Sequence, residues 1–108
     1  MIIEHVAIWV RDLENMRQYY CRFFGAISNQ KYINPTTSFE SYFLAFESGA
    51  RLEIMSRPDI PPNANDTVGT QHRGLIHLAF GVGDKSAVDK KAAELTANGF
   101  RILRGPRT

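Results

Sequence analysis

The chain has 108 residues, of which 44% are hydrophobic and 22% are charged, and its formal net charge is +2. This length and composition predict one folded soluble domain and argue against a disordered chain. The basic residues form no cluster, which argues against nucleic acid as a partner, and no apolar stretch approaches the ~20 residues that cross a bilayer. A single cysteine, Cys21, and the lack of a secretory signal predict a cytoplasmic protein.

The first 56 residues predict a strand, a helix and three further strands. Residues 2–10 are apolar and β-branched, which is typical of a buried strand. Asp12 is placed to cap a helix whose aromatic side chains recur at helical spacing, and Gly25 is placed to end that helix. The strands expected after the helix, with a turn at 34–37, are residues 26–33, 39–46 and 51–55.

The remaining residues predict a linker and then a second, shorter module. Residues 57–73 hold three prolines and few apolar side chains, which is typical of a linker. The elements expected after it are a strand at 75–82, a helix from Asp84 to Gly99 and a strand beginning at 100–103. We therefore expect a single domain over 1–108, made of module one (1–56), the linker (57–73) and a partial module two (74–108). Since module two lacks its last strands, the pattern favours a piece of a longer protein.

An internal repeat relates the two modules. HVAIWVRD at residues 5–12 aligns without a gap to HLAFGVGD at residues 77–84, an offset of 72 positions (77 − 5). Four positions are identical in the two copies: His5 and His77, Ala7 and Ala79, Val10 and Val82, and Asp12 and Asp84. Repetition of one supersecondary unit indicates that the modules share one architecture. It also predicts a histidine on the first strand of each module, with function where the two copies face each other.

Three residues form a candidate metal site: His5, Glu53 and His77. Because side chains alternate between the faces of a strand, each of the three is expected opposite a packed apolar face, and all three can point into one concave surface. Two imidazoles and a carboxylate suit Zn²⁺, Ni²⁺ or Co²⁺, and also Fe²⁺ or Mn²⁺. A lone His or Glu on a strand is more often structural or solvated, and the repeat is what favours a metal site. The repeat places the counterpart of Glu53 beyond Thr108, where a fourth ligand is expected.

Four stretches of the chain resemble the vicinal oxygen chelate superfamily, the glyoxalase/bleomycin resistance/dioxygenase group. Within that group the chain is most similar to bacterial proteins of the glyoxalase I (lactoylglutathione lyase) type. The resembling stretches are EHVAIWVRDL at 4–13, YYCRFFG at 19–25, ARLEIM at 50–55 and GLIHLAF at 74–80. The resemblance implies an α+β fold of paired βαβββ modules that form an incomplete barrel around a metal, with the second module truncated here. It also implies metal ligation by His5, Glu53 and His77, a homodimer, and a carboxylate such as Glu53 that moves a proton.

The implied activity is a metal-dependent lyase or isomerase that acts on a small bidentate oxygen substrate, such as the glutathione hemithioacetal of a 2-oxoaldehyde. Two other classes of function stay open. An Fe²⁺ extradiol-type dioxygenase uses a similar donor set, and a metal-free module that binds a drug or metabolite would use the same side chains to line a pocket. Fosfomycin-resistance proteins carry their Glu late in the chain, so the position of Glu53 argues mildly against that activity.

Overall fold

The computed structural model describes residues 1–65 and 69–103. It divides into two compact units, Met1–Asn63 and Ala64–Thr108. The boundary between the units falls within the predicted linker (57–73), of which residues 66–68 lie outside the described residues. In the described part of the chain, no helix has the length and hydropathy that crossing a membrane requires.

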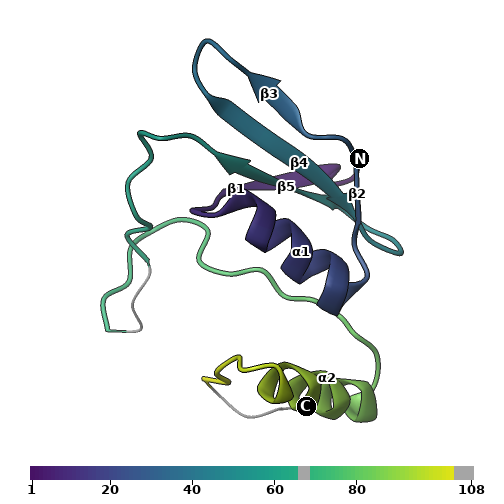
Figure 1. The fold of residues 1–108 in the computed structure, drawn as a ribbon. Helices are drawn as coiled ribbons and strands as arrows, with labels where there is room; N and C mark the ends of the chain where they lie inside the picture. Colours follow the sequence, from purple (N-terminus) through teal and green to yellow (C-terminus); the bar gives the residue numbers. More distant parts are fainter. Residues whose placement is uncertain (66–68, 104–108) are drawn as a thin grey trace. The chain divides into compact units, whose positions relative to one another are not determined.

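The first unit is a sheet covered on one face by a helix (Figure 1). Its elements, in chain order, are β1 (His5–Trp9), α1 (Leu13–Phe24), β2 (Ile27–Ser28), β3 (Tyr32–Asn34), β4 (Phe39–Ala45) and β5 (Arg51–Ser56). The strand order is β1-β5-β4-β2, and β3 also pairs with β4. β1 runs parallel to β5, while the other pairs are antiparallel. The α+β class predicted from the sequence is confirmed.

Helix α1 begins and ends where its capping residues predict. The Asp12 carboxylate accepts a hydrogen bond of 3.0 Å from the backbone N–H of Asn15, which satisfies an amide that the first turn leaves free. Gly25 follows the last turn with φ 66°, a left-handed conformation that favours glycine, and its N–H donates to the carbonyl of Tyr20.

Removing the Asp12 cap should destabilise the first unit measurably. We expect Asp12→Ala to lower the free energy of unfolding by about 1 kcal/mol, since the amide loses its acceptor. Asp12→Asn keeps an acceptor oxygen and should stay within a few tenths of a kcal/mol of the parent. Urea unfolding of the three proteins checks this, and equal losses in both variants would contradict the role of the cap.

The core lies between α1 and the face of the sheet that it covers. Leu44 on β4 and Ile54 on β5 have no exposed surface, and Leu52 and Leu13 are almost fully buried. Burying a side chain of this size contributes roughly 1.5–3 kcal/mol relative to leaving it in water. Even residues of β5 therefore face the helix, and the odd residues of β5 face away from it.

A polar contact ties α1 to β4 at the edge of this core. The hydroxyl of Tyr42 donates to the Glu14 carboxylate at 2.6 Å, and the Lys31 ammonium lies 2.8 Å from the same oxygen. Lys31, and then Tyr42, lower the pKa of Glu14 below its ordinary value. A carboxyl group with a lowered pKa stabilises the fold above its unfolded pKa, and this contribution is lost as the pH falls.

The single strand predicted over 26–33 is wrong in one respect, because the structure divides it. Ser28 pairs with Leu44 and Tyr32 pairs with Ser41, so three residues of this stretch lie opposite two residues of β4. The extra residue makes a bulge, which interrupts the ladder and bends the strand. Within the bulge the side-chain oxygen of Asn29 accepts a hydrogen bond from the backbone of β4 at Phe43.

The second unit contains helix α2 (Lys85–Ala97). As predicted, the Asp84 carboxylate caps it, accepting from Ala87 N–H at 2.9 Å, and Gly99 follows its end in a left-handed conformation (φ 88°). The strands predicted at 75–82 and 100–103 do not form within the described residues. A strand needs a hydrogen-bonded neighbour, and no described strand pairs with either stretch. The N–H of Phe100 instead donates to the carbonyl of Leu95, so this residue completes the end of the helix.

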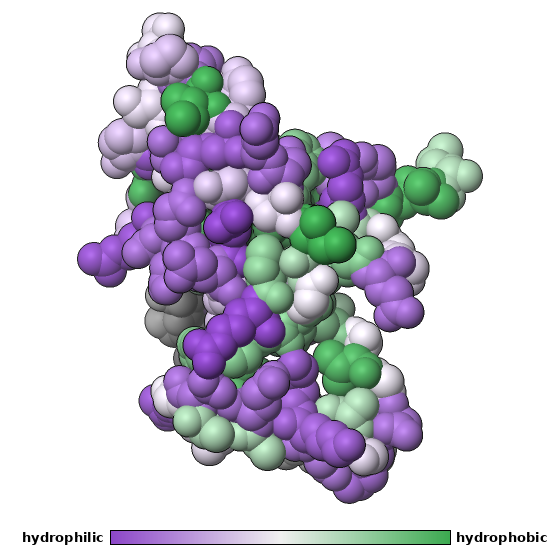
Figure 2. All heavy atoms as spheres, turned by 45° about the vertical axis from the view of Figure 1, so that its right-hand side comes forward, coloured by the Kyte–Doolittle hydropathy of each residue, from purple (hydrophilic) through white to green (hydrophobic). Residues whose placement is uncertain are grey.

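Hydrophobic side chains also reach the surface of the first unit. The largest exposed fractions in β2 and β3 belong to Ile27 (75%), Tyr32 (56%) and Ile33 (53%). Figure 2 shows such hydrophobic residues set among hydrophilic ones on the side of the molecule in view. Single exposed apolar side chains of this kind are ordinary on protein surfaces.

Candidate functional site

Two of the three predicted site residues lie together on the face of the sheet that points away from α1. His5 begins β1 and Glu53 lies in β5, the parallel neighbour of β1. The register pairs His5 with Arg51 and Ala7 with Glu53, so the two candidate ligands sit diagonally across adjacent strands. The predicted alternation of faces is observed, because buried Leu52 and Ile54 flank Glu53 in β5.

The facing atoms of this pair are Nε2 of His5 and Oε1 of Glu53, which are 4.0 Å apart. This separation is too long for a hydrogen bond. Zinc binds imidazole nitrogen and carboxylate oxygen at about 2.0–2.2 Å each, so one ion could reach both donors after a small inward rotation of the side chains. The Glu53 side chain is 16% exposed and the His5 side chain 42% exposed, which leaves His5 open to solvent.

Glu4 and Arg51 hold the other side of the His5 ring. Nδ1 of His5 lies 2.7 Å from Oε2 of Glu4, and Nη2 of Arg51 donates to Oε1 of Glu4. The hydrogen bond from Arg51, and then the one with His5, lower the pKa of Glu4 below its ordinary value. Glu4 is therefore an anion with both oxygens engaged.

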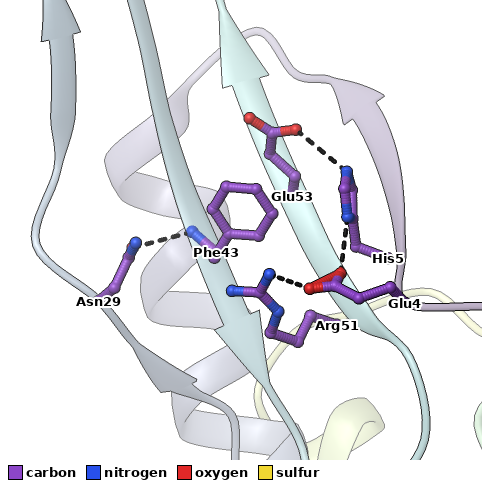
Figure 3. Close-up of polar contacts among 6 residues, drawn as sticks. All are labelled: Glu4, His5, Asn29, Phe43, Arg51 and Glu53. Atoms are coloured by element: carbon purple, nitrogen blue, oxygen red, sulfur yellow. Dashed lines mark hydrogen bonds and ion pairs between the residues drawn. The ribbon is translucent and has the colours of Figure 1, made fainter.

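The Phe43 ring lies beside both Arg51 and His5 (Figure 3). The Arg51 guanidinium lies 4.3 Å from the centre of the Phe43 ring, and the His5 ring meets the same ring edge-on at 5.2 Å and 82°. Asn29 fixes the backbone of Phe43, since its Oδ1 accepts from Phe43 N–H at 2.9 Å and its own N–H donates to the Phe43 carbonyl at 3.1 Å. The bulge in the neighbouring strand thus supports the position of this ring.

Further along the same face, an aromatic pair adjoins the site. Trp9 meets Phe39 edge-on at 5.9 Å between ring centres, and the Arg57 guanidinium lies 5.3 Å from the centre of the Trp9 ring. Trp9 remains 42% exposed. Alternation along β1 and β5 places Trp9, Arg51 and Met55 on the face of His5 and Glu53.

The third predicted residue, His77, belongs to the second unit and is described there by itself. It is exposed, in a stretch without regular structure, while its neighbours Leu78 and Phe80 are partly buried. Within residues 1–65 and 69–103, no group of three or more His, Cys, Asp or Glu side chains is arranged to hold a metal ion. The pair that the structure brings together is therefore His5 and Glu53.

Sequence reasoning missed Glu4 and Phe43 as parts of this site. Alternation along a strand would place the Glu4 side chain on the face opposite His5. The rule does not apply to Glu4, because β1 begins at His5. Phe43 is an odd residue of a predicted strand, so alternation places it on the face of the site. A search for metal ligands does not select it, because phenylalanine binds no metal.

The chain matches a known family over nearly its whole length. Residues 2–108 match the family described as Glyoxalase/Bleomycin resistance protein/Dioxygenase superfamily. No curated protein matches the chain.

Solved structures share the fold. The protein SMU.1112c is 25% identical with a TM-score of 0.73, over 94% of this chain and 77% of that one. A glyoxalase family protein from Enterococcus faecalis is 24% identical with a TM-score of 0.66, over 87% and 71% of the two chains. The fosfomycin resistance protein FosX from Listeria monocytogenes, complexed with Mn(II) and a sulfate ion, is 20% identical with a TM-score of 0.66, over 92% and 72%.

Proposed function

The chain belongs to the Glyoxalase/Bleomycin resistance protein/Dioxygenase superfamily, and on that premise we propose that it is a metal-dependent lyase or isomerase of the glyoxalase I type. The observation that carries this proposal is the 4.0 Å approach of His5 Nε2 to Glu53 Oε1 on one face of the sheet. An imidazole nitrogen and a carboxylate oxygen are donors that Zn²⁺, Ni²⁺ and Co²⁺ accept, as do Mn²⁺ and Fe²⁺. His77, the repeat counterpart of His5, is proposed as the third ligand.

The proposed substrate is small and carries oxygens on adjacent carbons, as in the glutathione hemithioacetal of a 2-oxoaldehyde. A divalent ion, when bound, supplies a Lewis acid that draws electrons from such oxygens. Glu53 is proposed to take the proton from the carbon that bears the hydroxyl and to return it to the adjacent carbonyl carbon, while the hydroxyl proton passes to the former carbonyl oxygen. The product is a 2-hydroxyacyl thioester with the same atoms as the substrate.

The shielding of Glu53 suits a proton carrier. Its side chain is far less exposed than those of Glu4 and His5 (16% against 55% and 42%), and the covered face of the sheet lies behind it. Because water has limited access, the carboxylate exchanges its proton with the substrate and not with bulk solvent. Trp9, on the same face, is proposed to border the substrate.

We propose a domain organisation and a homodimer together with this function. The proposed parts are module one (1–56), the linker (57–73) and a partial module two (74–108). The modules would pair around the metal, either within one chain or between two chains. Size measurement in solution tests the homodimer, for which we expect the mass of two chains.

Metal analysis tests the proposal. We expect about one divalent ion per site in the full-length protein, and its loss from the His5→Ala/His77→Ala double variant, because both imidazoles are proposed ligands. His72→Ala is the matched control, since His72 is an exposed histidine outside the proposed site and should leave the metal content unchanged. Elemental analysis of the three proteins gives the answer.

The metal that is found decides which activity is assayed next. Bound Zn²⁺, Ni²⁺ or Co²⁺ leads to an assay with the hemithioacetal of methylglyoxal. Bound iron contradicts the lyase and leads to assays of aromatic diols with oxygen uptake. No metal in any of the proteins, even after incubation with divalent ions, contradicts the proposal and leaves a metal-free binding module.

A further inference from the structure

We propose that Glu4 and Arg51 are positioning residues, which hold the His5 imidazole in the tautomer that presents a bare Nε2 towards Glu53. The role rests on the proposed function, because a metal ion requires a bare Nε2. The hydrogen bonds that support it lie within the first unit and do not depend on that function.

The first step is the state of the His5 ring. A carboxylate accepts hydrogen bonds and has no proton to donate, so the 2.7 Å contact with Glu4 requires the proton of a neutral His5 to be on Nδ1. Nε2 then carries a lone pair, and it is the atom that faces Glu53. A histidine that binds metal through one nitrogen commonly donates its other N–H to a carboxylate.

The second step is the role of Arg51. It occupies the remaining oxygen of Glu4, so Glu4 has no unengaged oxygen left for a metal and acts on His5 instead. The parallel register sets Arg51 directly beside His5, and the guanidinium is held over Phe43. The same ring meets His5 edge-on. The imidazole is thus confined by Glu4 at one nitrogen and by Phe43 at its side (Figure 3).

A purely structural role for these charges predicts a different outcome. The side chains of Glu4 and Arg51 are 55% and 41% exposed, and exposed ion pairs contribute little to stability. A variant of Glu4 should therefore change the His5 ring and the affinity for metal while leaving the unfolding transition almost unchanged.

The test begins on the metal-free full chain, by ¹⁵N NMR of the histidine side chains at a pH where imidazole is neutral. We expect the parent to show His5 with its proton on Nδ1, and Glu4→Ala to shift the proton to Nε2 in a large fraction of molecules. Glu4→Gln keeps an acceptor oxygen and should lie between them. Glu40→Ala is the matched control, because it removes a carboxylate that pairs with Lys31 at 3.7 Å, away from His5.

The second measurement is Zn²⁺ affinity, by competition with a chromophoric chelator. Glu4→Ala should weaken binding about 10–100-fold, as loss of a carboxylate behind a ligating histidine does elsewhere, and Glu40→Ala should not. An unchanged His5 tautomer in Glu4→Ala overturns the proposal. If the parent binds no Zn²⁺, the proposed function fails, and the NMR comparison still decides what Glu4 does.

Discussion

Leu44→Ala should lower the free energy of unfolding of the first unit by about 2–5 kcal/mol. Leu44 lies in β4 and is fully buried. It pairs with Leu52, one of the helix-facing residues of β5. The substitution to alanine removes apolar atoms and leaves a cavity. Hydrogen-bonded pairing of β4 with β2 and β5 limits how far the surrounding chain can move to fill that cavity. The loss is a large share of the total stability of a small domain.

Urea unfolding measures this loss, with Ile27→Ala as the matched control. Ile27 is a β-branched residue of the adjoining strand β2 and is 75% exposed, so its truncation should cost about 1 kcal/mol or less. Equal losses in the two variants would show that the core is not where the structure places it.

Glu53→Gln should lower kcat for the proposed substrate at least about 100-fold. The amide has nearly the shape of the carboxylate but cannot accept and return a proton, and it is a poorer ligand for a divalent ion. The protein should remain folded, because the Glu53 side chain faces away from the core and its neighbours Leu52 and Ile54 are unchanged.

Steady-state kinetics with the hemithioacetal of methylglyoxal, after metal loading, measures this loss. Glu47→Gln is the control, since Glu47 lies exposed in the connection between β4 and β5. Urea unfolding of both variants separates lost chemistry from lost structure. Full activity in folded Glu53→Gln would remove Glu53 from the mechanism.

The helix ends and the faces of β1 and β5 were predicted from residues that are close together in the chain. The Asp12 and Asp84 caps and the glycines that follow both helices depend on groups within a few residues, and all four stand where the sequence placed them. The faces of β1 and β5 followed from alternation alone, which is why His5 and Glu53 could be assigned to one side before their distance was known.

Features that depend on a partner strand were not predictable in this way. The extra residue between Ser28 and Tyr32 follows only from the register of both strand pairs, which the sequence does not contain. The stretch at 75–82 has the composition of a strand, but composition cannot supply the neighbour that a strand requires. The contact of Glu4 with His5 arises because the regular strand starts one residue later.

The parallel pairing of β1 with β5 sets when the proposed metal ligands His5 and Glu53 meet during folding. The β4–β5 hairpin closes over a short connection, whereas β1 pairs with residues 46 positions further along the chain (51 − 5). Chain entropy delays contacts between distant residues, so β1 is expected to dock after the hairpin forms. An intermediate with the hairpin alone has Glu53 but not His5 beside it. If His5 and Glu53 bind a divalent ion as proposed, that ion stabilises the fully paired sheet over such an intermediate, and its binding would report completed folding.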